Sequence, residues 1–191
     1  MGALWVAGSA AVVVVTTSLD LTGSLVRGAG GATAERRRRI LRGAGIARMA
    51  LVAVALVVSL AFVDLPVQAV GVLGLVPVAY GVMQLRRRRH AATPTAIVGW
   101  LSAGLVTLAL SGDDVAAWIV LLRWQAGRWE WLVAVVLVAA AVALPLLVGS
   151  IVRNGPAERT ARVLITSAAP AQIAVGTALV MISIVGGPLV V

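Results

Sequence analysis

The sequence predicts an all-α integral membrane protein built from about six transmembrane helices. Residues of the AVILMFWYC set make up 61% of the 191 residues, and charged residues only 12%. A soluble domain carries about 25% charged residues, and a soluble fold of this composition would expose large apolar patches to water. The apolar residues also fall into separate runs, most of them close to the roughly 20 residues that a helix needs to cross the hydrocarbon core.

The apolar runs form one transmembrane domain over residues 1–191, separated by short charged or turn-forming segments. The second and third runs are separated only by Asp64, Leu65 and Pro66, which is typical of a tight hairpin because Pro favours the first turn of a helix. A cleaved signal peptide is the competing interpretation of residues 1–26, but Met1 to Trp5 carry no basic residue. The six expected spans are 4–26, 45–63, 66–85, 97–122, 131–152 and 164–190.

Arginine placement predicts the orientation of the bundle. All sixteen basic residues are arginine, and fourteen of them fall on one side of the expected spans. These fourteen are Arg27, Arg36, Arg37, Arg38, Arg39, Arg42, Arg48, Arg86, Arg87, Arg88, Arg89, Arg153, Arg159 and Arg162; Arg123 and Arg128 are on the other side. Because cytoplasmic loops carry the excess of basic residues, both termini are expected outside. Four tryptophans near the outer helix ends agree with this orientation, since indoles favour the headgroup region. They are Trp5, Trp124, Trp129 and Trp131. Gly28 to Gly31 and Glu35 indicate a flexible loop among the first arginines.

Short matches between the two halves indicate an internal repeat. Ser18-Leu19-Asp20 and Ser111-Gly112-Asp113 are 93 residues apart, and Pro66-Val67-Gln68 resembles Pro170-Ala171-Gln172. With three spans in each half, the second half enters the membrane from the opposite side. We therefore expect a 3+3 inverted repeat, with halves at about 1–85 and 97–191 joined by the Arg86–Ala96 loop. In transporters of this kind the binding site lies near the midplane between the halves.

Three carboxylates, Asp20, Asp113 and Asp114, lie inside apolar spans. An Asp at the centre of a membrane helix costs about 2.5–3.5 kcal/mol on insertion scales, and such residues mark ion or proton pathways. Two structural interpretations stay open. Asp113 or Asp114 would cap a half-helix that starts after Gly112, and Asp20 would lie near the headgroups.

Helical spacing assigns provisional roles to these acids. Asp20 shares a face with Thr16 and Ser24, and Asp114 shares one with Thr107 and Ser111, so each helix presents a stripe of oxygen atoms. Oxygen donors suit hard or borderline divalent cations. Asp113 lies about 100° around the helix from Asp114. The expected ligands are Asp20 and Asp114, with Asp113 as ligand or proton carrier and with Thr17, Ser18 and Ser111 as helpers.

The remaining features predict packing and partners, and they argue against enzyme chemistry. Gly74 and Gly81 give a smooth face for close helix packing, and Pro77 between them predicts a kink.

The chain has no Cys, a single His (His90, expected in a solvated loop) and no nucleotide-binding, zinc-protease or nucleophile-elbow motif. We therefore expect no enzyme activity, no permanently bound cofactor and no nucleic-acid partner. The expected partners are the bilayer and the anionic lipids at the arginine loops; self-association is left open.

The sequence resembles the cadmium-resistance (CadD-type) transporter family of the LysE superfamily in three places. Thr16 to Leu21 is similar to the helix 1 segment of the family, and Leu73 to Gly81 to its helix 3 signature. Ser111 to Asp114 resembles its helix 4 segment, with Val115 where the family has Asn and Ser111 where Cys is common. The resemblance implies a secondary exporter of divalent metal ions in the plasma membrane of a bacterium.

We therefore expect a proton-coupled antiporter that exports a divalent cation, such as cadmium or manganese, from a site between helices 1 and 4. One alternative is an exporter of amino acids or small organic solutes, whose ammonium group the carboxylates would bind. Fourteen arginines at the cytoplasmic mouth favour that alternative because they repel cations. The other alternative is a membrane scaffold protein without transport, in which the three Asp residues are dispensable.

The orientation can be tested with single cysteines in this cysteine-free chain. Cysteines at position 37 or 88 are expected to resist an impermeant thiol reagent in intact cells and to react after permeabilisation, because the arginine-rich loops face the cytoplasm. Labelling of either position in intact cells contradicts the orientation.

Overall fold

The computed structural model of the chain is a bundle of α-helices, without a strand among the residues it describes, which are 2–87, 97, 99–125, 127 and 129–185. The prediction of an all-α fold is confirmed. The helices are α1 (Ala3–Thr17), α2 (Leu19–Gly30), α3 (Ala34–Ala61), α4 (Val67–Gly71), the 3-10 turn η1 (Val72–Gly74), α5 (Leu75–Arg87), α6 (Trp100–Leu110), α7 (Gly112–Trp124), α8 (Glu130–Asn154) and α9 (Ala157–Val185).

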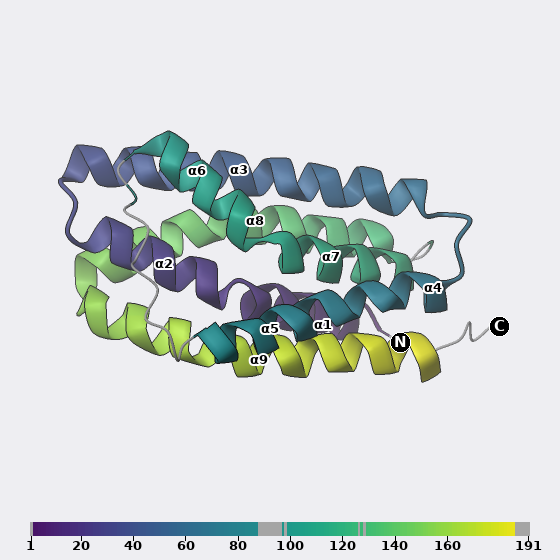
Figure 1. Cartoon of the computed structure of the whole chain (residues 1–191). Helices are drawn as coiled ribbons and strands as arrows, with labels where there is room; N and C mark the ends of the chain where they lie inside the picture. Colours follow the sequence, from purple (N-terminus) through teal and green to yellow (C-terminus); the bar gives the residue numbers. More distant parts are fainter. Residues whose placement is uncertain (1, 88–96, 98, 126, 128, 186–191) are drawn as a thin grey trace.

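Several of these helices are long and apolar enough to cross a membrane. Four continuous segments meet that description: α3, the α4–α5 segment, α8 and α9. The pairs α1–α2 and α6–α7 meet it together, but they bend by 52° and 57°, so the count is six if each bent pair is one span. The helices run along one common axis, and the start of α1 and the end of α9 lie at the same end of the bundle (Figure 1).

The first bend follows from a run of hydroxyl side chains. Thr16 Oγ1 donates to Val12 O at 2.6 Å, and Ser18 Oγ donates to Val14 O at 2.6 Å. Hydroxyls that bond the carbonyl one turn back compete with the backbone amide for the same acceptor and bend helices. At Ser18 the backbone leaves the helical region, with ψ near 1°, and α2 starts afresh at Leu19.

The second bend lies between Ser111 and Gly112. Ser111 has φ −111° and ψ 16°, and α7 starts at Gly112, a residue without a preference for continuing the helix. The new helix begins with the Val115 amide donating to Ser111 O at 3.1 Å. This agrees with the interpretation of the segment as the start of a half-helix, although Ser111, not Asp113 or Asp114, occupies the capping position.

The arginine segment after α2 differs from the flexible loop that the sequence indicated. Gly28 and Gly30 belong to α2, and α3 begins at Ala34 rather than at 45. Thr33 caps α3 by accepting from the Arg36 amide at 3.4 Å. The loop is therefore reduced to residues 31–33, and Glu35 with the arginines from 36 to 42 lie on a regular helix. The prediction of a flexible loop was wrong because this segment is packed: a β-carbon added at Gly28 would lie 2.9 Å from Ile97, and one at Gly30 would lie 3.0 Å from Ala157.

Helix α7 occupies the centre of the bundle. Its residues 116–123 are all buried, and Trp118 is the largest of the fully buried side chains. The main apolar core gathers around α7 from α1, α3, α8 and α9, whereas a second cluster joins α2, α3 and α8 toward the opposite end. Both bends lie between these two apolar clusters, away from either end of the bundle.

Glycines allow α5 and η1 to lie directly against α9. Gly74 and Gly81 are buried, and a β-carbon added at Gly81 would stand 2.8 Å from the Ala169 carbonyl oxygen. Pro77 lies in the first turn of α5, and the backbone of residues 72–74 is a 3-10 turn. This irregularity fits the proline, which lacks an amide hydrogen and crowds the carbonyl four residues before it.

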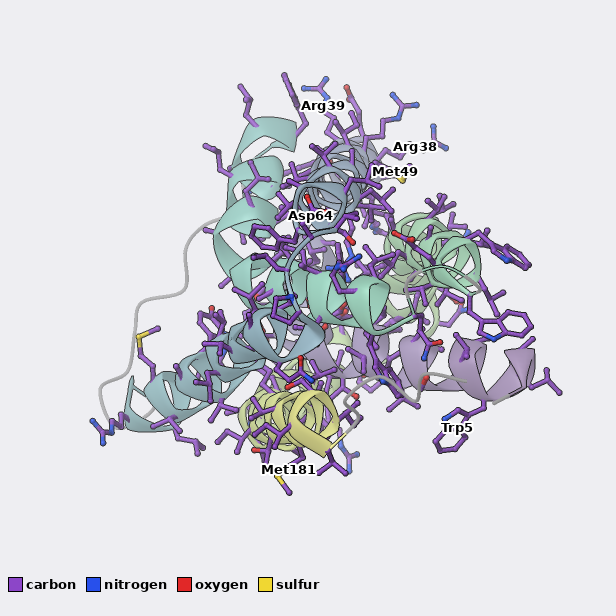
Figure 2. All side chains as sticks on the ribbon, turned by 90° about the vertical axis from the view of Figure 1, so that its right-hand side faces the viewer. Trp5, Arg38, Arg39, Met49, Asp64 and Met181 are labelled. Atoms are coloured by element: carbon purple, nitrogen blue, oxygen red, sulfur yellow. The ribbon has the colours of Figure 1, made fainter. Side chains whose placement is uncertain are left out.

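Most arginines of the described chain lie on the surface at one end of the bundle. Arg27, Arg86, Arg153 and Arg159 are exposed there, together with most of the arginines at the start of α3. Arg123, near the other end, is buried and donates to Val63 O at 2.8 Å. Trp5 lies at the rim of that end (Figure 2), and Trp131 is similarly exposed. Residues 88–96, which include His90 and most of the expected connecting loop, lie outside the described residues, as do Arg128 and the end of the last expected span.

The contact between α5 and α9 can be tested with Gly176→Ala. A β-carbon at Gly176 would lie 2.7 Å from the carbonyl oxygen of Gly74. The helices must separate, so we expect the variant to lose about 1–3 kcal/mol of unfolding free energy, measured by thermal unfolding in detergent. The matched control is Gly8→Ala on α1, which has no atom within 4 Å of the added carbon. Equal stability of the two variants contradicts the close contact.

Candidate functional site

The two helix bends lie within reach of one buried arginine. Arg48 of α3 donates through Nη1 to Asp114 Oδ2 at 2.6 Å, and its Nη2 donates to Ser18 Oγ. Asp114 lies in the first turn of α7, and Ser18 is the residue at which α1 ends. A single guanidinium therefore connects the break in the first bent pair with the break in the second.

Arg48 corrects an expectation from the sequence. It was counted among the cytoplasmic arginines that set the topology, but it is only 1% exposed and lies midway along α3. Its guanidinium carbon stands 4.8 Å from the centroid of the Trp118 ring, a cation–π distance. A charged group in the interior of a membrane bundle is costly unless it is paired, and Asp114 together with Trp118 supplies that compensation.

The other two acids each bond to a glutamine. Gln84 Nε2 on α5 donates to Asp20 Oδ2 at 2.6 Å, and Gln172 Nε2 on α9 donates to Asp113 Oδ2 at 2.7 Å. Each Asp thus bonds to a Gln further along the chain, at a separation of 64 residues for Asp20 and 59 for Asp113. The sequence comparison had matched Gln172 with Gln68, but Gln68 is exposed at the start of α4, and Gln84 takes the corresponding place.

Asp113 and Asp114 point to different neighbours, as their angular separation predicted. Asp113 turns toward α9 and Asp114 toward α3. Both are buried, together with Asp20. Asp114 is bonded to the charged Arg48 and Asp113 to the neutral Gln172, so the two acids differ in the charge of their partners.

The three hydroxyl residues expected to help lie at the breaks. Thr17 and Ser18 are buried, and both hydroxyls bond to the Val14 carbonyl, at 3.4 Å and 2.6 Å. Ser111 is fully buried at the second break. Neither Arg48 nor the two glutamines had been singled out as site residues. Their sequence signal was an isolated polar residue within an otherwise apolar helix.

Four buried oxygens beside the second break accept no hydrogen bond from the described residues. They are Ser111 Oγ, Asp113 Oδ1, Asp114 Oδ1 and Gln172 Oε1. A buried polar atom without a partner costs about 1–3 kcal/mol, so a cluster of them in a native protein calls for an explanation. Carboxylate, amide and hydroxyl oxygens are the donors that hard cations prefer.

Three buried acids and one buried arginine lie around the breaks: Asp20, Asp113, Asp114 and Arg48. The described residues contain no group of three or more His, Cys, Asp or Glu side chains close enough to hold a metal ion together. A cation at this place would therefore be held by a mixture of carboxylate, amide and hydroxyl oxygens.

The broken helices add fixed dipoles to the site. Helices α2 and α7 begin at the breaks and place amide groups there, whereas α1 and α6 end there and place carbonyl groups. The amino ends of α2 and α7 carry a partial positive charge, and the three acids lie in the first turns of these two helices. The carbonyl ends of α1 and α6 are potential ligands for a cation, as in transporters with discontinuous helices.

Comparison with protein-family models, with curated proteins and with solved structures finds no match to this chain. The function of the site is therefore inferred from its own side chains.

The coupling of Arg48 to Asp114 can be tested with a double-mutant cycle. Arg48→Gln leaves a buried carboxylate without its partner, and we expect a loss of about 3–5 kcal/mol of unfolding free energy. Adding Asp114→Asn is expected to restore most of that loss, because Gln and Asn form a neutral hydrogen-bonded pair. The cycle is measured by thermal or denaturant unfolding in detergent. Additive losses in the double variant contradict a direct interaction.

Proposed function

We propose that this chain is a secondary-active transporter that exports a divalent cation across the cell membrane in exchange for protons. In this proposal each bent pair is one span, the six spans form a 3+3 inverted repeat, and both termini are outside. The observation that carries the proposal is the pair of helix breaks, 93 residues apart between Ser18 and Ser111, each followed by a buried Asp. Intramembrane acids at broken helices mark ion pathways in transporters.

The proposed cation ligands are Asp20 and Asp113, with Ser111 Oγ and Gln172 Oε1 as neutral ligands. Asp20 and Asp113 accept hydrogen bonds from the side-chain amides of Gln84 and Gln172, whereas Asp114 is held by Arg48 at 2.6 Å. This exchanges the roles that the sequence had suggested for Asp113 and Asp114. Arg48 and Asp114 then form a permanent ion pair that holds the two breaks together, and Thr17 and Ser18 shape the first break.

The two proposed carboxylate ligands suggest the stoichiometry. One divalent cation or two protons neutralise the negative charges of Asp20 and Asp113, and charge within the membrane is costly unless it is neutralised. Exchange of one divalent cation for two protons is then electroneutral, and protons compete with the cation for Asp20 and Asp113.

An exporter of amino acids is the second candidate, and one observation favours it. Arg48 places a guanidinium between the two breaks, where it would bind the carboxylate of a substrate if Asp114 released it. The carboxylates of Asp20 and Asp113 would bind the ammonium group. Because Arg48 is already paired with Asp114, the geometry supports the cation exporter better.

Transport by variants in proteoliposomes tests the proposal. Asp20→Asn and Asp113→Asn keep the shape of the site but remove one negative charge each, so we expect export of the transported cation to fall at least tenfold. The assay uses a panel of Cd²⁺, Mn²⁺, Zn²⁺, Co²⁺ and an amino-acid analogue. Asp64→Asn is the matched control, since Asp64 is an exposed acid in the α3–α4 turn (Figure 2), and it is expected to transport like the wild type.

The pH of the vesicle lumen is followed in the same assay. We expect two protons to move for each cation, without a change in membrane potential. Transport of the amino-acid analogue alone selects the second candidate. Normal cation export by both Asn variants contradicts the assignment of the site. If the wild type transports no member of the panel, the non-transporting scaffold becomes the better interpretation.

A further inference from the structure

A groove on the lipid-facing side of the bundle lies between α3 and α8, away from the helix breaks. It has a volume of about 550 Å³ and is lined by Arg38, Arg42, Gly45 and Met49 of α3 and by Pro145 and Leu146 of α8, among others. Gly45 has no side chain to fill it. A β-carbon at Gly45 would stand 3.4 Å from the Pro145 ring, so α3 and α8 approach one another closely at these two residues, which both line the groove.

The lining residues of α3 form one stripe along the helix. Arg38, Arg42, Gly45 and Met49 are spaced four, three and four residues apart, which places them on one face. The stripe covers about 16 Å at 1.5 Å per residue. This is about half of the roughly 30 Å thickness of the hydrocarbon core, so the groove has the depth of a single leaflet. Its polar end carries both arginines, and the rest of the wall is apolar.

The two arginines of the groove differ from Arg36, Arg37 and Arg39 because no hydrogen bond or ion pair holds their guanidinium groups among the described residues. Arg39 pairs with Glu35, while Arg36 and Arg37 donate to the carbonyl oxygens of Ile97 and Ala32. Figure 2 shows Arg38 and Met49 on the same side of α3, with Arg39 pointing away from them. Arg38 and Arg42 are exposed and four residues apart, so both guanidinium groups are available to one anionic group.

We propose that this groove is a binding site for an anionic phospholipid of the leaflet at the arginine-rich end. Arg38 and Arg42 bind the phosphate of the headgroup, and one acyl chain lies along the apolar wall between α3 and α8. Charge complementarity selects this occupant, because two unpaired guanidinium groups at the headgroup level recognise a phosphate. A zwitterionic lipid fits the apolar wall equally well, but its own positive charge weakens the interaction with the arginines. The proposal does not depend on transport.

Native mass spectrometry of the full chain tests the site, with phosphatidylglycerol and phosphatidylcholine as probes. We expect the wild type to retain one phosphatidylglycerol in preference to phosphatidylcholine. The variant Arg38→Gln/Arg42→Gln is expected to bind phosphatidylglycerol about tenfold more weakly, because each arginine near an anionic headgroup contributes appreciably to the affinity. Both residues are on the surface, so the variant is expected to fold. The control Arg39→Gln/Arg159→Gln removes the same charge at the same end, outside the groove, and is expected to bind like the wild type.

A second variant tests the apolar wall without changing the charge. Gly45→Leu places a bulky side chain at a lining position of the groove, and we expect it to release the lipid although both arginines are present. Equal loss of phosphatidylglycerol in the two arginine variants overturns the proposal, since binding would then follow net charge alone. It is also overturned if the wild type is a dimer that Gly45→Leu separates, because a second copy of the chain would then occupy the groove.

Discussion

The buried ion pair between Arg48 and Asp114 is the interaction on which the rest of the site depends. It joins α3 to the start of α7, and through Ser18 it also reaches the end of α1. Neither charge tolerates the bundle interior alone, because removing one partner of a buried pair costs about 3–5 kcal/mol. The Arg48 guanidinium therefore fixes the positions of both helix breaks. The Trp118 ring beside it explains why the most buried helix, α7, carries a large aromatic residue one turn after its acids.

The pair also separates the three acids into two kinds. Asp114 has a permanent cationic partner, whereas Asp20 and Asp113 have neutral amide partners in Gln84 and Gln172. An amide donates to a carboxylate without neutralising it. In the proposed function Asp114 would therefore have the structural role and Asp20 and Asp113 would exchange the cation and the protons, although all three acids have the same chemistry.

The sequence predicted the membrane class, the apolar helices and the burial of the three acids, because these follow from composition and the rarity of intramembrane charge. It could not predict which acid faces which neighbour. The stripe of Thr107, Ser111 and Asp114 assumed an unbroken helix, but the 57° bend at Ser111 resets the angular phase, as the 52° bend does between Thr16 and Asp20. Arg48 was missed for a related reason: α3 begins eleven residues earlier than the apolar run, which moves Arg48 from the membrane edge to the middle of the helix.

In the proposed 3+3 arrangement these contacts would have a mechanical meaning. Asp20 and Gln84 would belong to the first half and Asp113 and Gln172 to the second, so a rocking motion of one half against the other would preserve both hydrogen bonds. The Arg48–Asp114 ion pair would join the halves. A divalent cation between Asp20 and Asp113 would join the halves a second time, from a different direction. Loading and release would then change the number of ionic links between the halves, which is what coupling of binding to a conformational change requires.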